Sequence, residues 1–160
     1  MESAHTRKVE PMSIPLGVVR IFSGIIANKF PRLVQLGLAI ASYEGWDVAG
    51  SVAQRNKNPG NLRASWLKEG VDKNFAFFFD AEHGWLALYY DLYAKCSGHT
   101  ATGLLPRNTL RELIFVYAPK NENDSEKYLN FIIQRLNAKY GEDPIVWRSR
   151  EIRWFIGEGI

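Results

Sequence analysis

Apolar residues recur at helical spacing near the start of the chain, within residues 12–27. At about 100° per residue, one face carries Ile14, Val18, Ile21, Phe22, Ile25 and Ile26, and the opposite face carries Arg20, Ser23 and Gly24. This pattern predicts an amphipathic helix whose apolar face packs on the core. The run is shorter than the ~20 residues that span a bilayer, and it lacks the cleavage site of a convincing signal peptide. The polar residues 1–11 are expected to be loosely held.

Helix start signals predict further helices along the chain. Asp80 is a good N-cap, and Thr109 with Glu112 has the spacing of a capping box. Asn123 with Glu126 gives a similar start signal. The expected helices cover residues 31–43, 81–95, 109–117, 123–139 and 147–155.

Two short runs, residues 62–66 and 74–79, have the composition of strands and are separated by a turn at Glu69-Gly70. They predict one small antiparallel sheet near the middle of the chain. The length of 160 residues suits a single domain, and the chain has no internal repeat and no interdomain linker. We therefore expect an α+β fold that is mainly α, with a helical core.

The composition narrows the chemistry that the chain could carry. A single cysteine, Cys96, excludes an internal disulfide and CxxC zinc sites, and three scattered histidines give no metal-ligand spacing. No P-loop, GxGxxG or GxSxG motif occurs, so we expect neither a metal nor another cofactor. A formal net charge of +3 permits contact with an anionic polymer without indicating nucleic acid. Aromatic residues make up 13% of the chain and can form platforms for sugars or bases.

Glu44 has an unusual position at the end of the helix predicted for residues 31–43. It projects near the centre of the apolar side, one turn beyond Ile40. Burial and the negative end of the helix dipole both disfavour the charged carboxylate, so both raise its pKa. A carboxyl group that keeps its proton near neutral pH is what a general acid requires. The alternative is that the helix frays before Glu44 and the side chain turns into water.

The segment after Glu44 is rich in small and polar residues. Residues 54–63, QRNKNPGNLR, contain Asn and Gln side chains that can present paired donors and acceptors, and Pro59-Gly60 imposes a tight turn. Polar amides beside one unusual carboxylate and many aromatic residues describe a sugar site better than a phosphate site. A hydrophilic loop with turn residues is the simpler alternative for this segment.

Four runs of the chain carry a family resemblance in combination. They are AIASYEGW (39–46), QRNKNPGNLR (54–63), FAFFFDAEHGWLALYYDL (75–92), and TLRELIFVYAP followed by END (109–119 and 122–124). With these motifs, residues 31–140 resemble a lysozyme-like family found in phages and prophages. Members of that family resemble lytic transglycosylases and muramidases, which act on peptidoglycan.

The resemblance implies a lysozyme-like fold, mainly α, with a small β-sheet wall. In that fold residues 31–140 would form the catalytic domain, with Glu44 as the catalytic acid at the floor of the cleft. Residues 1–30 would be an N-terminal extension, and residues 141–160 a C-terminal helical extension packed on the domain. Either extension could contact a virion or membrane partner. The substrate-binding residues would be Asn58, Asn61, Arg63, Tyr117, Gln54 and Trp46.

The implied reaction cleaves the β-1,4 glycosidic bond between N-acetylmuramic acid and N-acetylglucosamine in the glycan strands of peptidoglycan. Glycosidases commonly use two carboxyl groups, but among Asp47, Glu69, Asp72 and Asp80 no second one stands out. A single-carboxyl lytic transglycosylase therefore fits better than a hydrolytic muramidase. A non-catalytic virion structural or peptidoglycan-binding protein on the same scaffold is a further alternative.

The end of the chain offers an alternative of another class. Residues 147–154, WRSREIRW, alternate Arg with aromatic residues, which can contact phosphates and stack on bases. We prefer a final helix with Trp147 and Trp154 docked inward and the Arg side chains solvated, and we expect no nucleic-acid partner. Because the chain has no convincing signal peptide, action on the cell wall or in the periplasm would need delivery in a virion or release by a holin-like route.

Overall fold

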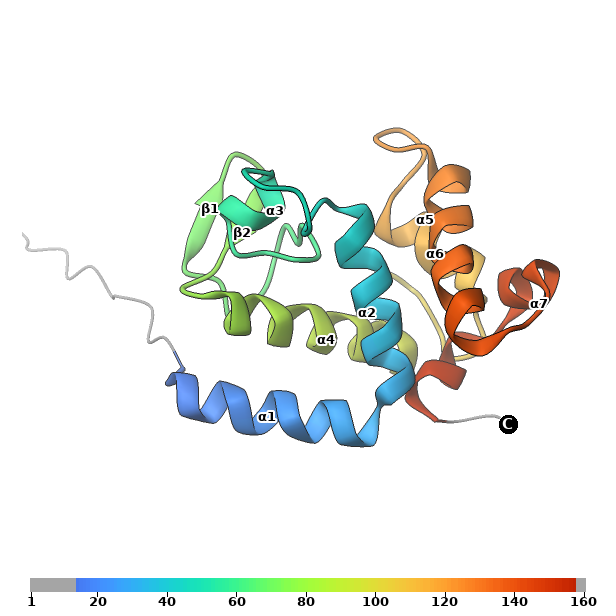
Figure 1. Cartoon of the computed structure of the whole chain (residues 1–160), viewed down its shortest axis with the longest axis horizontal. Helices are drawn as coiled ribbons and strands as arrows, with labels where there is room; N and C mark the ends of the chain where they lie inside the picture. Colours follow the sequence, from blue (N-terminus) through green and yellow to red (C-terminus); the bar gives the residue numbers. More distant parts are fainter. Residues whose placement is uncertain (1–13, 158–160) are drawn as a thin grey trace, which may run out of the picture.

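The computed structural model describes residues 14–157, which form a mainly helical fold with one small sheet (Figure 1). The prediction of an α+β fold that is mainly α is confirmed. The predicted loosely held residues 1–11 lie outside the described residues. The elements in chain order are α1 (Leu16–Lys29), α2 (Pro31–Tyr43), α3 (Val52–Arg55), β1 (Gly70–Asp72), β2 (Phe75–Phe77), α4 (Ala81–Ser97), α5 (Leu110–Tyr117), α6 (Ser125–Tyr140), α7 (Pro144–Ser149) and the 3-10 helix η1 (Ile152–Ile156).

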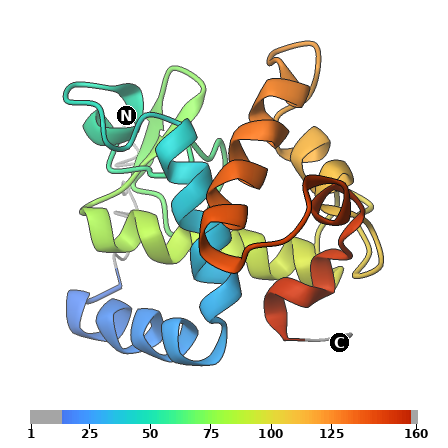
Figure 2. The same ribbon diagram turned by 45° about the vertical axis from the view of Figure 1, so that its right-hand side comes forward.

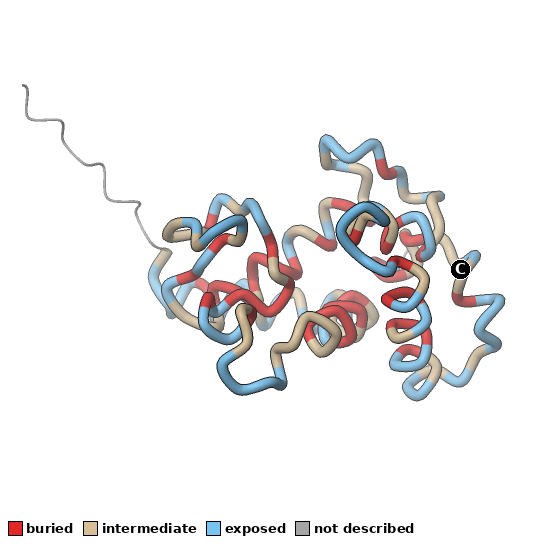
Figure 3. The backbone as a smooth tube through the Cα atoms, turned by 90° about the horizontal axis from the view of Figure 1, so that it is seen from above, coloured by how far each residue is buried: buried red, intermediate tan, exposed pale blue. Residues whose placement is uncertain are grey.

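Two groups of elements lie on either side of α2 (Figures 1 and 2). On one side are α3, β1 and β2, on the other are α5, α6 and α7, and α4 runs beneath both groups. The larger core joins the helices of the second group to α2 and α4, and it includes Leu36 and Leu92. A smaller cluster joins α1, β2 and α4 through Val19, Ala76 and Leu86. Buried residues accordingly concentrate where the elements meet, as Figure 3 shows.

Capping residues set several helix boundaries. The side chain of Asp80 accepts a backbone N–H of the first turn of α4, as predicted. Thr109 and Glu112 make both hydrogen bonds of the predicted capping box at the start of α5. The start of α6 is capped by Asp124 rather than by the predicted Asn123, because it is the carboxylate of Asp124 that accepts a first-turn N–H. The helix predictions were therefore right in type and off by one residue at this boundary.

The sheet differs from the predicted hairpin in its first strand. The antiparallel partner of β2 is β1, and the two strands are joined at residues 73–74. The predicted strand at residues 62–66 and the predicted turn at residues 69–70 are therefore wrong. The carbonyl of Leu62 does accept the backbone N–H of Ala76, at 2.8 Å, on the other edge of β2. That segment covers the edge as irregular chain, in which Leu62 is buried while Arg63, Ala64 and Trp66 are exposed.

The C-terminal part is two short helices instead of the single helix predicted for residues 147–155. The chain is extended at Arg150, which has φ −65° and ψ 127°, between α7 and η1. Its carbonyl accepts the backbone N–H of Leu110, and an isolated β-bridge joins Thr109 to Glu151. These long-range backbone bonds compete with helix continuation and break the helix.

The aromatic residues of this part face the core, whereas its arginines are not simply solvated. Trp147 is fully buried, and its ring centroid lies 5.4 Å from that of Trp154. The guanidinium of Arg150 lies 4.7 Å from the Trp147 ring and 4.5 Å from the Trp154 ring. Arg148 pairs with Glu126. The inward orientation of Trp147 is therefore confirmed, but the prediction of a solvated Arg150 is wrong because this side chain packs on the two rings.

The helix predicted from the N-terminal pattern is present, but its apolar face points outward. In α1, Val19 is completely buried, while Ile21, Phe22 and Ile25 are more than half exposed. α1 packs against α4, and Arg20 on its flank forms an ion pair with Glu82 at the start of α4. The prediction that this apolar face packs on the core is wrong for Ile21, Phe22 and Ile25, because these contacts turn them outward, whereas Ile14 and Ile26 at its edge do pack against the core. No described helix is long and apolar enough to cross a membrane.

Candidate functional site

Glu44 is held in place by the way α2 ends. It is the C-cap residue, and the following Gly45 has φ +90°, a left-handed conformation that a glycine adopts without strain. The N–H of Gly45 donates to Ser42 O, and the N–H of Trp46 donates to Ala41 O. This pair of bonds is the Schellman arrangement. The helix therefore does not fray before Glu44, and its backbone direction is fixed.

The carboxylate of Glu44 accepts hydrogen bonds from two other parts of the fold. Asn61 Nδ2 donates to Oε2 at 2.9 Å, and the Tyr128 hydroxyl on α6 donates to Oε1 at 2.8 Å. Burial raises the pKa of Glu44 above the ordinary value, and the bonds from Asn61 and Tyr128 oppose that rise without cancelling it. The side chain is thus a carboxyl with an elevated pKa that is already oriented by two donors.

The loop that carries Asn61 is held close to this site by tight packing. Asn61 itself has φ +45°, a conformation that Asn tolerates better than most residues. The hydroxyl of Tyr117 donates to the carbonyl of Gly60. A Cβ at Gly60 would lie 2.6 Å from that hydroxyl and 2.7 Å from Leu88 Cδ1, so only glycine fits there. The Pro-Gly-Asn turn therefore brings the Asn61 amide to Glu44.

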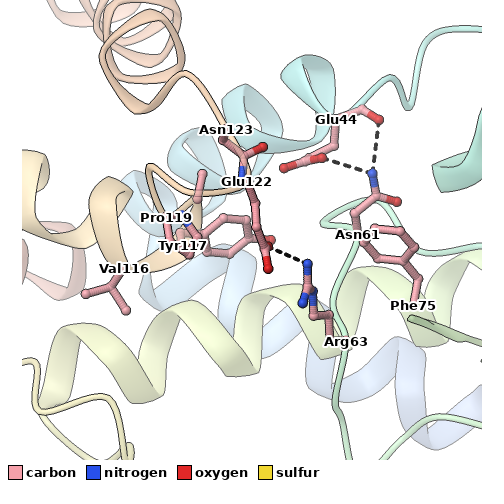
Figure 4. Close-up of a pocket in the computed structure, with 10 residues that line it drawn as sticks. Glu44, Asn61, Arg63, Phe75, Val116, Tyr117, Pro119, Glu122 and Asn123 are labelled. Carbon is pink, nitrogen blue, oxygen red and sulfur yellow. Dashed lines mark hydrogen bonds and ion pairs between the residues drawn. The ribbon is translucent and has the colours of Figure 1, made fainter. Parts of the chain in front are cut away.

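A pocket of about 350 Å³ opens beside Glu44 (Figure 4). It lies between the two groups of elements, with the loop after α3 on one side and the chain from α5 to α6 on the other. In the close-up, an ion pair between Arg63 and Glu122 joins the two sides. Volumes of this order are typical of small-molecule sites. The lining residues that bear on chemistry are Glu44, Asn61, Arg63, Phe75, Tyr117 and Glu122.

The structure brings three of the six predicted binding residues to this pocket, namely Asn61, Arg63 and Tyr117. Asn58 is not among them, because its side chain is completely buried. Its amide donates to the carbonyls of Leu62 and Ala76 and accepts the N–H of Leu62. The expectation that Asn58 contacts substrate is therefore wrong, since this side chain ties the loop to the sheet.

Gln54 and Trp46 also lie outside the pocket lining. The Gln54 amide donates to the carbonyl of Trp46 at 2.7 Å, which closes the loop between α2 and α3. The Trp46 ring packs edge-on against Trp85, with centroids 5.6 Å apart. Both residues are thus expected to act on the site only by supporting the chain that follows Glu44.

None of the carboxylates considered as a partner for Glu44 lines the pocket. Asp80 caps α4, Asp72 lies 3.7 Å from Arg55, and Asp47 is exposed and accepts a bond from the Ser42 hydroxyl. Glu69 likewise lies outside the lining. Glu122 is the other carboxylate among the described residues of the pocket, and it is paired with Arg63.

Three residues of the site were not singled out from the sequence, namely Phe75, Tyr128 and Glu122. Tyr128 lies on the apolar stripe of α6, where a tyrosine cannot be distinguished from an ordinary core residue. Glu122 lies in an exposed loop, outside any periodic pattern. Its membership of the Glu-Asn-Asp run that contributes to the family resemblance is the signal that could have identified it.

No protein-family model, curated protein or solved structure is significantly similar to the chain. Among the described residues, no group of three or more His, Cys, Asp or Glu is placed to hold a metal ion. What the pocket does offer is a carboxyl with a raised pKa, two donors fixed on it, and polar and aromatic groups around an open space. That combination can protonate and orient a polar substrate.

Proposed function

We propose that this protein cleaves the β-1,4 glycosidic bond of peptidoglycan, between N-acetylmuramic acid and N-acetylglucosamine, with Glu44 as the general acid. The observation that carries the proposal is the partly buried carboxyl of Glu44, with its raised pKa, at the edge of an open pocket. A raised pKa keeps the proton available near neutral pH, as protonation of a leaving oxygen requires. The family resemblance supplies the substrate class.

The surroundings of Glu44 suit a group that must change its protonation state during the reaction. Burial favours the protonated form before bond cleavage. The hydrogen bonds from Asn61 and Tyr128 favour the carboxylate that remains after the proton has left. One carboxyl can thus serve as acid in the first step and as base in the second.

The reaction is a lytic transglycosylation in this proposal. Glu44 gives its proton to the glycosidic oxygen as the bond between that oxygen and C1 breaks. The sugar that contains C1 also carries a 6-hydroxyl. The Glu44 carboxylate accepts the proton of that hydroxyl, whose oxygen attacks C1 and closes an anhydro ring. No second carboxylate is needed, which agrees with the pairing of Glu122 to Arg63. A hydrolytic muramidase would instead need a water and a carboxyl positioned opposite the acid.

The proposal includes a lysozyme-like arrangement. Three features support it. Glu44 lies at the end of the core helix α2, a small antiparallel sheet follows it in the chain, and the pocket lies between the group of elements that contains the sheet and the group that contains α5 and α6. A likeness in the arrangement of elements does not by itself imply chemistry, so the test must be made on the reaction.

The experiment compares the native chain with Glu44→Gln on purified peptidoglycan sacculi. Gln keeps the shape of Glu44 but cannot give up a proton, so release of soluble fragments should fall by at least about 100-fold, the usual contribution of a general acid. Asp47→Asn, a change of an exposed carboxyl outside the pocket, is the matched control and should retain activity. Undiminished release by Glu44→Gln would exclude Glu44 as the acid.

Mass spectrometry of the released fragments separates the two reactions. Anhydro ends identify a transglycosylase, and reducing ends identify a hydrolase. If the native chain binds sacculi and releases nothing, the non-catalytic peptidoglycan-binding alternative replaces the enzyme.

A further inference from the structure

Two further hollows lie in sequence next to the pocket beside Glu44. The first, of about 260 Å³, shares Asn61, Arg63, Val116 and Tyr117 with the Glu44 pocket and is called the middle hollow. The second, of about 380 Å³, shares Ala64 and Asp91 with the middle hollow and is called the distal hollow. Because each hollow shares lining residues with the next, the three lie in a row along the chain from residue 61 to residue 66, and together they are called the groove.

The distal hollow contains a pair of exposed aromatic rings. Trp66 is 63% exposed and Tyr90 is 52% exposed, although both side chains are large and partly apolar. Their ring centroids lie 5.8 Å apart at an interplanar angle of 76°, so each ring supports the other edge to face. An exposed aromatic pair packed ring against ring in a hollow is a feature of ligand sites rather than of ordinary surface.

The groups around these rings are polar and of mixed charge. The distal hollow is also lined by Ser65, Lys68, His99 and Thr100, which can donate and accept hydrogen bonds. Between the hollows, Asp91 holds the ammonium of Lys95 at 2.5 Å. The charges that line the groove are thus partly neutralised within the protein.

This chemistry fits a carbohydrate better than a nucleic acid. The C–H face of a pyranose ring packs on an aromatic ring, and its hydroxyl and acetamido groups bind polar side chains at the edge. A nucleic acid needs unpaired cations along its phosphates. Two of the groove's cations, Arg63 and Lys95, are instead paired with Glu122 and Asp91.

We infer that the groove binds several consecutive sugars of one glycan strand, and that Trp66 with Tyr90 forms its distal subsite. Trp66 and Tyr90 line neither the Glu44 pocket nor the middle hollow. A subsite at these two rings therefore contacts a different sugar from the one whose bond lies at Glu44. The inference rests on the proposed function for the class of ligand. It adds that recognition depends on strand length.

The test measures binding of β-1,4-linked N-acetylglucosamine oligomers by calorimetry, with Glu44→Gln as the parent so that no cleavage occurs. Adding Trp66→Ala should weaken binding of the hexasaccharide about tenfold, as expected for loss of an aromatic anchor. Binding of the disaccharide at Glu44 should not change. Phe79→Ala is the matched control, because Phe79 is also 63% exposed and lines none of the three hollows.

The outcomes separate this inference from the proposed function. Equal hexasaccharide affinity with and without Trp66 overturns the distal subsite, whatever the result of the sacculus assay. Failure of the parent to bind either oligomer overturns it as well. A third outcome is that Trp66→Ala weakens binding of the hexasaccharide alone while the native chain releases no fragments from sacculi. In that case the groove is a saccharide-binding surface, and the proposed catalysis is wrong.

Discussion

At the scale of single residues, Glu44 illustrates how a functional group can weaken the fold that holds it. Its carboxylate loses hydration on burial, and the bonds from Asn61 and Tyr128 recover only part of that loss, because its pKa is still raised. A group whose pKa is higher in the folded than in the unfolded state binds a proton more strongly in the folded state. Its ionisation therefore makes folding less favourable.

This leads to a prediction for stability as a function of pH. Below about pH 4 the carboxyl is protonated in both states and adds no penalty. As the pH rises above that value the unfolded state ionises first, so the native chain loses stability until the pH passes the raised pKa of Glu44. Glu44→Gln has no such loss. The urea midpoint of Glu44→Gln minus that of the native chain should therefore become more positive from pH 4 to pH 7.

The trend with pH, rather than a difference at one pH, is the test. A gap between the two proteins that stays constant from pH 4 to pH 7 would mean that Glu44 ionises normally in the folded state. Asp47→Asn, a change of an exposed carboxyl outside the pocket, is measured beside them as the control.

Single residues also show what can be read from a sequence and what cannot. The position of Glu44 follows from helical periodicity and the dipole, both of which are local properties. The role of Asn58 does not follow from local properties. An Asn in a polar loop gives the same sequence pattern whether its amide binds a ligand or binds backbone carbonyls, which here are those of Leu62 and Ala76. Tyr128 reaches Glu44 only through the packing of α6 on α2.

At the scale of elements, the approach of α4 to the loop before Gly60 decides where Asn61 lies. Gly84, in the first turns of α4, faces that loop. A Cβ on Gly84 would lie 1.9 Å from the carbonyl oxygen of Lys57 and 2.9 Å from Pro59 Cδ. The contact involves backbone, which cannot move aside as a flexible side chain could. Gly84, which belongs to the run 75–92 of the family resemblance, thus has a packing function.

Gly84→Ala should therefore destabilise the protein although alanine favours helix. We expect a loss of about 1–3 kcal/mol in the free energy of unfolding, the usual cost of overpacking, measured by urea denaturation. Gly24→Ala in α1 is the matched control, since a Cβ there meets nothing within 4 Å. That change should stabilise by roughly 0.5–1 kcal/mol through helix propensity alone. Equal effects of the two substitutions would contradict the packing argument.

Elements were predictable where their signals are local. The caps at Asp80 and Thr109 operate within one turn, so the starts of α4 and α5 could be predicted from the sequence. The break at Arg150 and the outward apolar face of α1 depend on partners far along the chain. The strands are only three residues long, too short for a clear alternation of apolar and polar positions. Hydrophobic periodicity indicates that a helix is amphipathic, but it does not show whether the apolar face packs against the core.

At the scale of the whole molecule, the pocket exists because two groups of elements meet at the end of α2. Neither group contains the site alone, since Asn61 and Arg63 come from one side and Tyr117 and Glu122 from the other. The ion pair of Arg63 with Glu122 connects the two sides at their exposed surface, with side chains 56% and 40% exposed. An exposed pair of this kind contributes little to stability, typically below about 1 kcal/mol.

The same pair provides a test of the single-carboxyl mechanism. Glu122 is the one carboxylate among the described pocket residues that could act with Glu44. If Arg63 holds it as a structural partner, Glu122→Gln should lower the rate of fragment release from sacculi less than about tenfold, because only orientation across the pocket is disturbed. If Glu122 were the second catalytic carboxyl, the loss would approach the at least 100-fold effect of removing an acid or base. Measuring the rate beside Glu44→Gln, with circular dichroism to verify folding, therefore decides between one carboxyl and two.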